Sequence, residues 1–294
     1  MLDLFKRITN KIKSNPVYLY IFIYFILLLL LSCFRDARTD ETYYLKETSL
    51  IAELLRNGIW VGNYGVGLHG FLFKLPVAIV FIILGRPSVF VATLFTILLS
   101  IISLIIFYKI VKEHFLKDKY AFWATVLLSV VLYFINMSLS FNRDIPAVFT
   151  VLLFLYFFLN NANKWLIGVS FLLMLDAKEH VFLTVAPIYI LYLFMSEINH
   201  FKKGEIWNGI KRVTAGCFTG YILPLIWIIL MFTTSIIPMN MFLASISGST
   251  EVGLGWNKSQ FSIEAASQNL MGEEGKEIPK LLICSDPVQS SSEV

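Results

Sequence analysis

Long apolar runs separated by short polar segments dominate the chain. A helix needs about 20 mostly apolar residues to cross the roughly 30 Å hydrocarbon core of a bilayer. Seven runs, of which the fifth is the shortest, approach or reach this length: 17–34, 88–108, 120–139, 145–159, 165–175, 181–195 and 213–234. They predict an all-α polytopic membrane protein with about seven transmembrane helices.

A further apolar run, residues 71–85, contains Lys74 and Pro76, and its pattern alone does not decide whether it crosses the membrane. Basic residues collect in short loops on the cytoplasmic side. If this run does not cross, most basic residues of the short segments share one side, namely those of 1–16, 109–119 and 197–212 together with Lys164. We therefore predict a cytoplasmic N-terminus and a first outer loop, residues 35–87, that contains interfacial helices.

Composition supports this class of protein and excludes others. With 57% hydrophobic and only 15% charged residues, the chain is too apolar for a soluble domain or a disordered one. Its net charge of +4 is too small to indicate nucleic-acid binding, and its cysteines and histidines lack the spacing of a metal site. We predict a basic N-terminus (1–16), a seven-span module (17–235) and a polar, partly disordered outer tail (236–294).

Charged residues of the first outer loop begin an amphipathic helix. Asp40 and Glu41 precede an apolar face, and Gly58 is a plausible end of the helix. Such a helix is expected to lie flat on the membrane surface with both carboxylates above the lipid headgroups. The alternative is that these carboxylates only stabilise the start of the helix.

Two further corners on the same predicted side carry charges. Asp144 is placed as an N-cap with Pro146 in the first turn, and Arg143 offers a planar donor fork that suits phosphate. The second corner contains Asp176, Lys178 and Glu179 after a short apolar run, which as a helix rises only about 16 Å. Either this helix starts further back, or the corner lies somewhat inside the membrane boundary. Ionisable residues inside the membrane boundary pair with one another or line a site.

Several motifs on this side follow one another in an order that is known from one class of enzymes. They are Asp40-Glu41-Thr42-Tyr43-Tyr44, the stretches 53–60 and 84–90, Arg143-Asp144-Ile145-Pro146 and Lys178. Together they resemble the integral-membrane glycosyltransferases of the GT-C class, in particular the lipid A aminoarabinose transferases and the protein O-mannosyltransferases. The first motif resembles the Asp-Glu-x-x-Tyr motif of that class, and the resemblance covers residues 15–235.

The chain also departs from this class. Leu68-His69-Gly70 stands where the class usually has a Pro-Pro or Lys-Pro step. Members normally continue with several more spans and often an outer globular domain. The chain therefore resembles the N-terminal membrane module, and we expect a truncated, partner-dependent or inactive protein.

The resemblance implies transfer of a hexose or pentose from a polyprenyl-phosphate donor to a lipid, glycan or protein acceptor on the outer face of the cell membrane. It implies that the catalytic carboxylate is Asp40 or, as second choice, Glu41. The donor phosphate would be bound by Lys178, Arg143 and Arg38. The expected supporting residues are Asp144, Tyr43, Tyr44, His69 and Glu179. A divalent cation and a partner subunit stay open, and metal ligands are unknown.

Two other classes of function fit the same residues. A transporter or flippase of a lipid-linked solute would line its path with Asp144, Asp176, Lys178 and Glu179. A non-catalytic membrane subunit would fit a chain that lacks the C-terminal half of the enzyme class. Inverted repeats or matching broken spans would favour transport, and the sequence shows neither clearly.

Overall fold

The computed structural model describes residues 16–35, 39–58, 70–198 and 205–233, and within them the protein is all-helical. Ten helices are assigned in these ranges: α2 (Pro16–Ser32), α3 (Thr39–Arg56), α4 (Phe71–Leu84), α5 (Val89–His114), α6 (Asp118–Val130), α7 (Leu132–Leu139), α8 (Asp144–Leu159), α9 (Lys164–Ala177), α10 (Glu179–Ser196) and α12 (Ile206–Thr233). The predicted all-α fold class is confirmed for the described residues.

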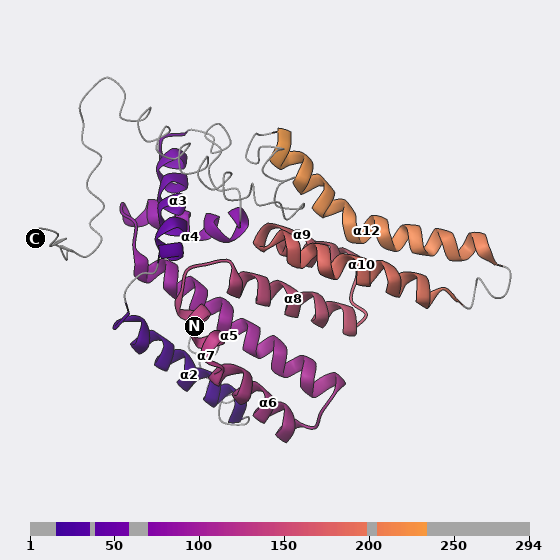
Figure 1. Ribbon diagram of the computed structural model, residues 1–294, viewed down its shortest axis with the longest axis horizontal. Helices are drawn as coiled ribbons and strands as arrows, with labels where there is room; N and C mark the ends of the chain where they lie inside the picture. Colours follow the sequence, from indigo (N-terminus) through magenta and orange to yellow (C-terminus); the bar gives the residue numbers. More distant parts are fainter. Residues whose placement is uncertain (1–15, 36–38, 59–69, 199–204, 234–294) are drawn as a thin grey trace, which may run out of the picture.

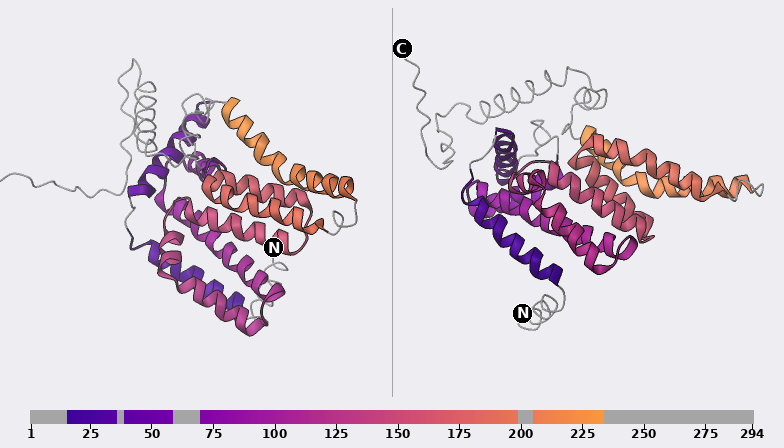
Figure 2. Two further views of the ribbon diagram at one scale, coloured as in Figure 1. Left: turned by 45° about the vertical axis from the view of Figure 1, so that its right-hand side comes forward. Right: turned by 60° about the horizontal axis from the view of Figure 1, so that its bottom comes forward.

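Most of the helices lie side by side in one bundle, and α3 and α4 cover one of its ends (Figure 1). The two turned views in Figure 2 agree with this arrangement. Helix α9 packs on α12, α8 and α10, while α5 packs on α8, α6 and α2. We call the end that carries α3 and α4 the α3–α4 end. The corners before α8 and before α10 lie at this end, and the lysine-rich segment between α5 and α6 lies at the other, as does the α8–α9 connection (Figure 1).

Three helices are long and apolar enough to cross a membrane: α5, α10 and α12. A fourth candidate is the pair α6 and α7, if the two helices count as one bent span. Helices α2, α4 and α8 are apolar but shorter, and α9 has only 14 residues. The described helices thus support three or four spans by length and composition, and the count of seven stays a prediction.

Helix α4, the ambiguous apolar run, begins and ends at the α3–α4 end. The N–H of Gly70, just before α4, donates to the carbonyl of Asp176 at the end of α9. Helix α5 starts a few residues after α4 ends and runs parallel to α8, because Lys109 lies 5.7 Å from the ring centre of Tyr156 near the C-terminal ends of both helices. This course is the one that the non-crossing interpretation requires.

The bend between α6 and α7 is stabilised from α2. The two helices meet at 64°, and Val131 between them has an extended backbone. Carbonyl groups freed by such a break need partners, because a lipid environment offers none. The hydroxyl of Tyr24 donates to the carbonyl of Ser129 at 2.9 Å, and Tyr20 bonds the hydroxyl of the same serine.

Helix α3 is amphipathic as predicted, and its end agrees with the sequence. It stops at Arg56, and Gly58 follows in the left-handed conformation that glycine adopts most readily. Its apolar side is buried against α4 in a cluster that includes Leu50, Ile51 and Phe81. This side therefore packs on a neighbouring helix, and the expected place of α3 at the membrane surface stays a prediction.

Candidate active site

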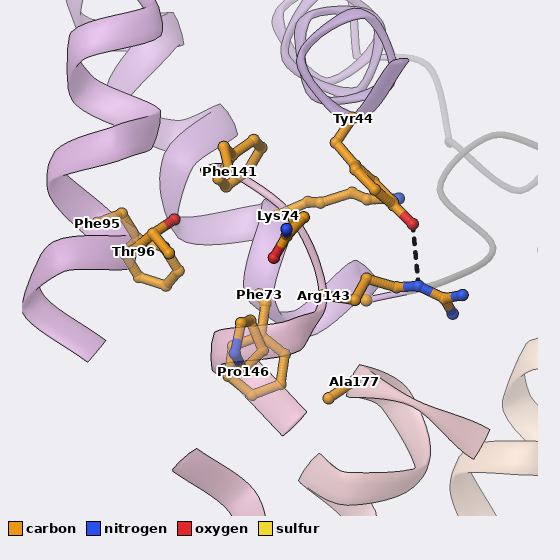
Figure 3. A pocket seen from close by; sticks show the side chains of 11 residues that line it. Tyr44, Phe73, Lys74, Phe95, Thr96, Phe141, Arg143, Pro146 and Ala177 are labelled. Atoms are coloured by element: carbon orange, nitrogen blue, oxygen red, sulfur yellow. Dashed lines mark hydrogen bonds between the residues drawn. The ribbon is translucent and has the colours of Figure 1, made fainter. Parts of the chain in front are cut away.

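Charged and polar side chains from four separate parts of the chain meet at the α3–α4 end. They come from α3, from α4, from the corner between α7 and α8 and from the corner between α9 and α10. Figure 3 shows how Tyr44 of α3 and Lys74 of α4 lie toward Arg143 of the α7–α8 corner. The predicted site residues Tyr44, Arg143, Lys178 and Glu179 are thus neighbours, although they are far apart in sequence.

Arg143 is held by two partners at the start of α8. Its Nε donates to the hydroxyl of Tyr44 at 3.0 Å, drawn as the dashed line in Figure 3, and its Nη1 donates to Glu179 Oε2 at 3.2 Å. Burial works to lower the pKa of the guanidinium, but the neighbouring Tyr44, Glu179 and Glu47 hold that pKa above its ordinary value. Arg143 therefore supplies a permanent, oriented positive charge.

The start of α8 differs from the prediction by one residue. The helix begins at Asp144, and Arg143 occupies the N-cap position without a side-chain cap bond. The side-chain oxygen of Asn142 instead accepts the N–H of Asp144 at 3.0 Å. The predicted N-cap role of Asp144 is wrong, and its carboxylate is consequently available for Lys178.

Lys178 and Asp144 form the most accessible ion pair of this group. The Lys178 Nζ lies 2.6 Å from Asp144 Oδ1, and both side chains are 26% exposed. Lys178 is the junction between α9 and α10, with an extended backbone that directs the chain from one helix into the next. A ligand at this end can therefore contact the ammonium group without opening the core.

Glu41 is an anchor of the site. Its side chain is fully buried, forms an ion pair with Arg35 and accepts the backbone N–H of Phe141 at 3.0 Å. These contacts tie the start of α3 to the end of α2 and to the α7–α8 corner. A carboxylate held in this way is a poor choice for a base that must reach an acceptor, which leaves Asp40 as the first choice.

The sequence analysis did not identify a second buried ion pair, between Glu47 and Lys74. The two side chains are 5% and 3% exposed and bond one another between α3 and α4. Lys74 also lies 5.1 Å from the ring centre of Tyr44, within cation–π range. The only feature of the sequence that pointed to Lys74 was its place inside an apolar run. No feature of the sequence pointed to Arg35, the partner of Glu41.

A pocket opens between these groups. Its empty space, including the part open to solvent, is about 320 Å³. Lys74 and Arg143 supply its positive charge, Tyr44, Phe73, Phe95 and Phe141 supply aromatic walls, and Thr96, Asn142, Pro146 and Ala177 complete the lining with Gly70 (Figure 3). Cations beside aromatic and apolar walls suit an amphiphilic anion.

Some predicted site residues lie outside this description. Arg38 and His69 fall outside the described residues, and Asp40 is placed as the second residue of α3 while its side chain is not described. Tyr43 is partly buried and packs edge-on against Tyr44. Among the described residues, no group of three or more histidine, cysteine, aspartate or glutamate side chains could hold a metal ion.

The helices indicate a multi-pass membrane protein, and the charged end of the bundle is its candidate site. Residues 68–234, more than half of the chain, match the dolichyl-phosphate-mannose-protein mannosyltransferase family. The chain therefore belongs to this GT-C family of glycosyltransferases, as the resemblance in its sequence implied. Comparisons with curated proteins and with solved structures give no match.

The matched residues include Lys74, Arg143, Asp144, Lys178 and Glu179 but not the motif that begins at Asp40. The family supports a polyprenyl-phosphate sugar as the donor. The roles of individual residues rest on the contacts of their side chains.

Proposed function

We propose that this protein transfers a sugar from a polyprenyl-phosphate donor to a lipid, glycan or protein acceptor on the outer face of the cell membrane, with inversion at the sugar carbon. One observation supports the proposal. Arg143 and the accessible Lys178, from two different corners, lie together at the end of the bundle where α3, with Asp40 as its second residue, is packed. The proposed base and the residues proposed to bind the donor phosphate would thus face the same substrate.

The proposed chemistry needs a base and a charge for the leaving group. The Asp40 carboxylate takes the proton from the acceptor hydroxyl as its oxygen attacks the anomeric carbon of the sugar. The bond from that carbon to the phosphate oxygen breaks, and the polyprenyl phosphate leaves with the bonding electrons. Lys178 and Arg143 stabilise the additional negative charge in a partly desolvated site, where such contacts are strongest.

Lys74 extends this arrangement into the pocket. It lies with Arg143 and Tyr44 in the pocket wall, and its positive charge there is paired with Glu47. The lipid tail of the donor would lie along the apolar helices. A divalent cation would neutralise further phosphate charge, and comparing transfer with and without a chelator decides whether one takes part.

The basic segments support the proposed side of the membrane. Lys112, Lys117 and Lys164 lie at or near the helix ends opposite the candidate site. Because such residues mark the cytoplasmic side, the α3–α4 end would face outward. Single cysteines at positions 144 and 119, in a chain without its own cysteines, test this with a membrane-impermeant thiol reagent. Labelling of both from the same side would contradict the proposed orientation.

Transfer itself is tested with labelled dolichyl-phosphate mannose and a membrane fraction as acceptor source. Asp40→Asn removes the base, and we expect transfer to fall by about 10²–10⁴-fold. The matched control is Asp118→Asn, because Asp118 is exposed at the opposite end and pairs only with Lys112 and Tyr108 among described residues. Transfer by Asp40→Asn at the rate of the control would remove Asp40 from this role.

The phosphate ligand is tested separately. Lys178→Met should raise the KM for the donor about tenfold or more, because a charge-assisted contact to phosphate is lost. Lys112→Met is the control, since Lys112 also forms an ion pair with an aspartate but at the opposite end. An unchanged donor KM in Lys178→Met would refute the assignment of this lysine.

A further inference from the structure

Asp176 lies two residues before Lys178 and has no part in the transfer as proposed above. Its side chain is only 6% exposed, whereas that of Lys178 is 26% exposed. A carboxylate that is buried so deeply costs free energy unless hydrogen bonds satisfy it. Its partners therefore indicate its role.

Two backbone groups at the start of α4 donate to Asp176. The N–H of Leu72, in the first turn of α4, donates to Oδ2 at 2.9 Å, and the N–H of Gly70 donates to the backbone carbonyl at 2.8 Å. The end of α9 is thereby fastened to the start of α4.

The contact with α4 is an N-terminal cap supplied by a distant helix. The first N–H groups of a helix have no partner within it, and a negative charge is favoured there by the helix dipole. The residue before α4, Gly70, makes no side-chain cap and has φ of 73°. Asp176 supplies the missing acceptor from 104 residues away in sequence.

This cap holds the corner that carries the proposed phosphate ligand. One residue of the corner, Asp176, is fixed by α4, and the following Lys178 and Glu179 pair with the α7–α8 corner. Gly70 also packs closely against Arg143, because a Cβ placed on Gly70 would lie 3.7 Å from Cγ of Arg143. Movement at the cap would therefore displace both proposed phosphate ligands.

We propose that Asp176 is a positioning residue of the transfer reaction, which caps α4 and thereby fixes Lys178 next to Arg143 before the donor phosphate binds. This role rests on the proposed function. Positively charged groups that are held in place before binding cost no ordering when the phosphate arrives. Loss of the cap should therefore weaken donor binding more than it slows transfer at saturating donor.

Two substitutions separate the hydrogen bond from the charge. Asp176→Asn keeps a side-chain oxygen that accepts the N–H of Leu72, and Asp176→Leu has a similar size but no acceptor. We expect Asp176→Leu to raise the donor KM about tenfold, as loss of one buried acceptor implies. Asp176→Asn should stay within about threefold of the wild type, since the cap survives. Ser170→Ala, a buried change in the same helix, is the control and should leave the KM unchanged.

A double variant shows whether Asp176 acts through Lys178. In a chain that already carries Lys178→Met, the substitution Asp176→Leu should raise the donor KM no further, because residues that act through one another are not additive. A merely structural role would reduce the amount of active enzyme and leave the KM unchanged. Full additivity of the two KM effects would overturn the positioning role.

Amide hydrogen exchange follows the cap without any assay of transfer. In Asp176→Leu, exchange at residues 70–74 should become faster, while in Asp176→Asn it should match the wild type. Faster exchange with an unchanged donor KM overturns the positioning role and leaves the proposed function intact. A wild-type chain that binds and transfers no sugar overturns the proposed function and this role with it.

Discussion

The buried ion pair between Glu47 and Lys74 offers the sharpest test of how the α3–α4 end is held together. The two side chains are 5% and 3% exposed and join α3 to α4. Lys74→Met would leave the Glu47 carboxylate buried without its counter-charge. Breaking a buried pair in this way costs about 3–5 kcal/mol, which for a chain of this size lowers the melting temperature by roughly 6–20 °C.

Replacing both partners should reverse most of this loss. In Glu47→Gln with Lys74→Met, the side-chain volumes are nearly kept and no charge is left buried. The double variant should lie within about 2 kcal/mol of the wild type, because the desolvation penalty of both ions disappears together with their attraction. The lost contact between Lys74 and the ring of Tyr44 is a smaller effect, about 0.5–2 kcal/mol.

Thermal unfolding of the purified protein in detergent measures these differences. Lys112→Met is the matched control, because its partner Asp118 is exposed and the substitution should leave the melting temperature unchanged. The reasoning is refuted if Lys74→Met melts like this control. It is equally refuted if the double variant is as unstable as Lys74→Met alone, since the buried carboxylate would then not be the cause.

Three further substitutions test the packing in the same thermal assay. Gly168→Ala should lower the free energy of unfolding by about 1–3 kcal/mol, because the new Cβ would lie 2.6 Å from the carbonyl oxygen of Thr219 and push α9 away from α12. Wild-type stability of this variant would show that the two helices are not this close. Tyr24→Phe should cost about 1–3 kcal/mol through the unpaired carbonyl of Ser129, and a neutral effect would mean that this carbonyl has another partner. Gly85→Ala should cost about 1–2 kcal/mol from its φ of 74° alone, since no atom lies within 4 Å of the added Cβ, whereas Gly85→Asn should cost less.

Hydropathy was sufficient to locate most helices, because an apolar run that must bury or satisfy its backbone has few alternatives to a helix. The end of α3 at Gly58 could also be predicted, since glycine adopts the left-handed backbone that terminates helices. The start of α8 could not, because the residue type of Asp144 suits an N-cap, whereas in the structure Arg143 takes that position and Asn142 accepts the N–H of Asp144.

Partners of the charged residues were harder to predict than their location. The motifs indicated that Arg143, Lys178 and Glu179 share one side, and the structure brings them together. Nothing in the sequence paired Lys74 with Glu47, because such a contact depends on how α4 packs against α3. The partner of the apolar side of α3 could not be predicted for the same reason, since periodicity shows that a face is buried but not what covers it.

The sequence by itself determined that this is an all-helical membrane protein and indicated its enzyme class, because hydropathy and motif order are local properties of the chain. Only the tertiary structure decided which charges are anchors and which are accessible. Glu41 and Lys74 are enclosed among helices, whereas Lys178 and Asp144 keep about a quarter of their surface exposed. That difference arises from contacts between residues about a hundred positions apart, such as Glu41 with Phe141 and Asp176 with Leu72, which no local pattern records.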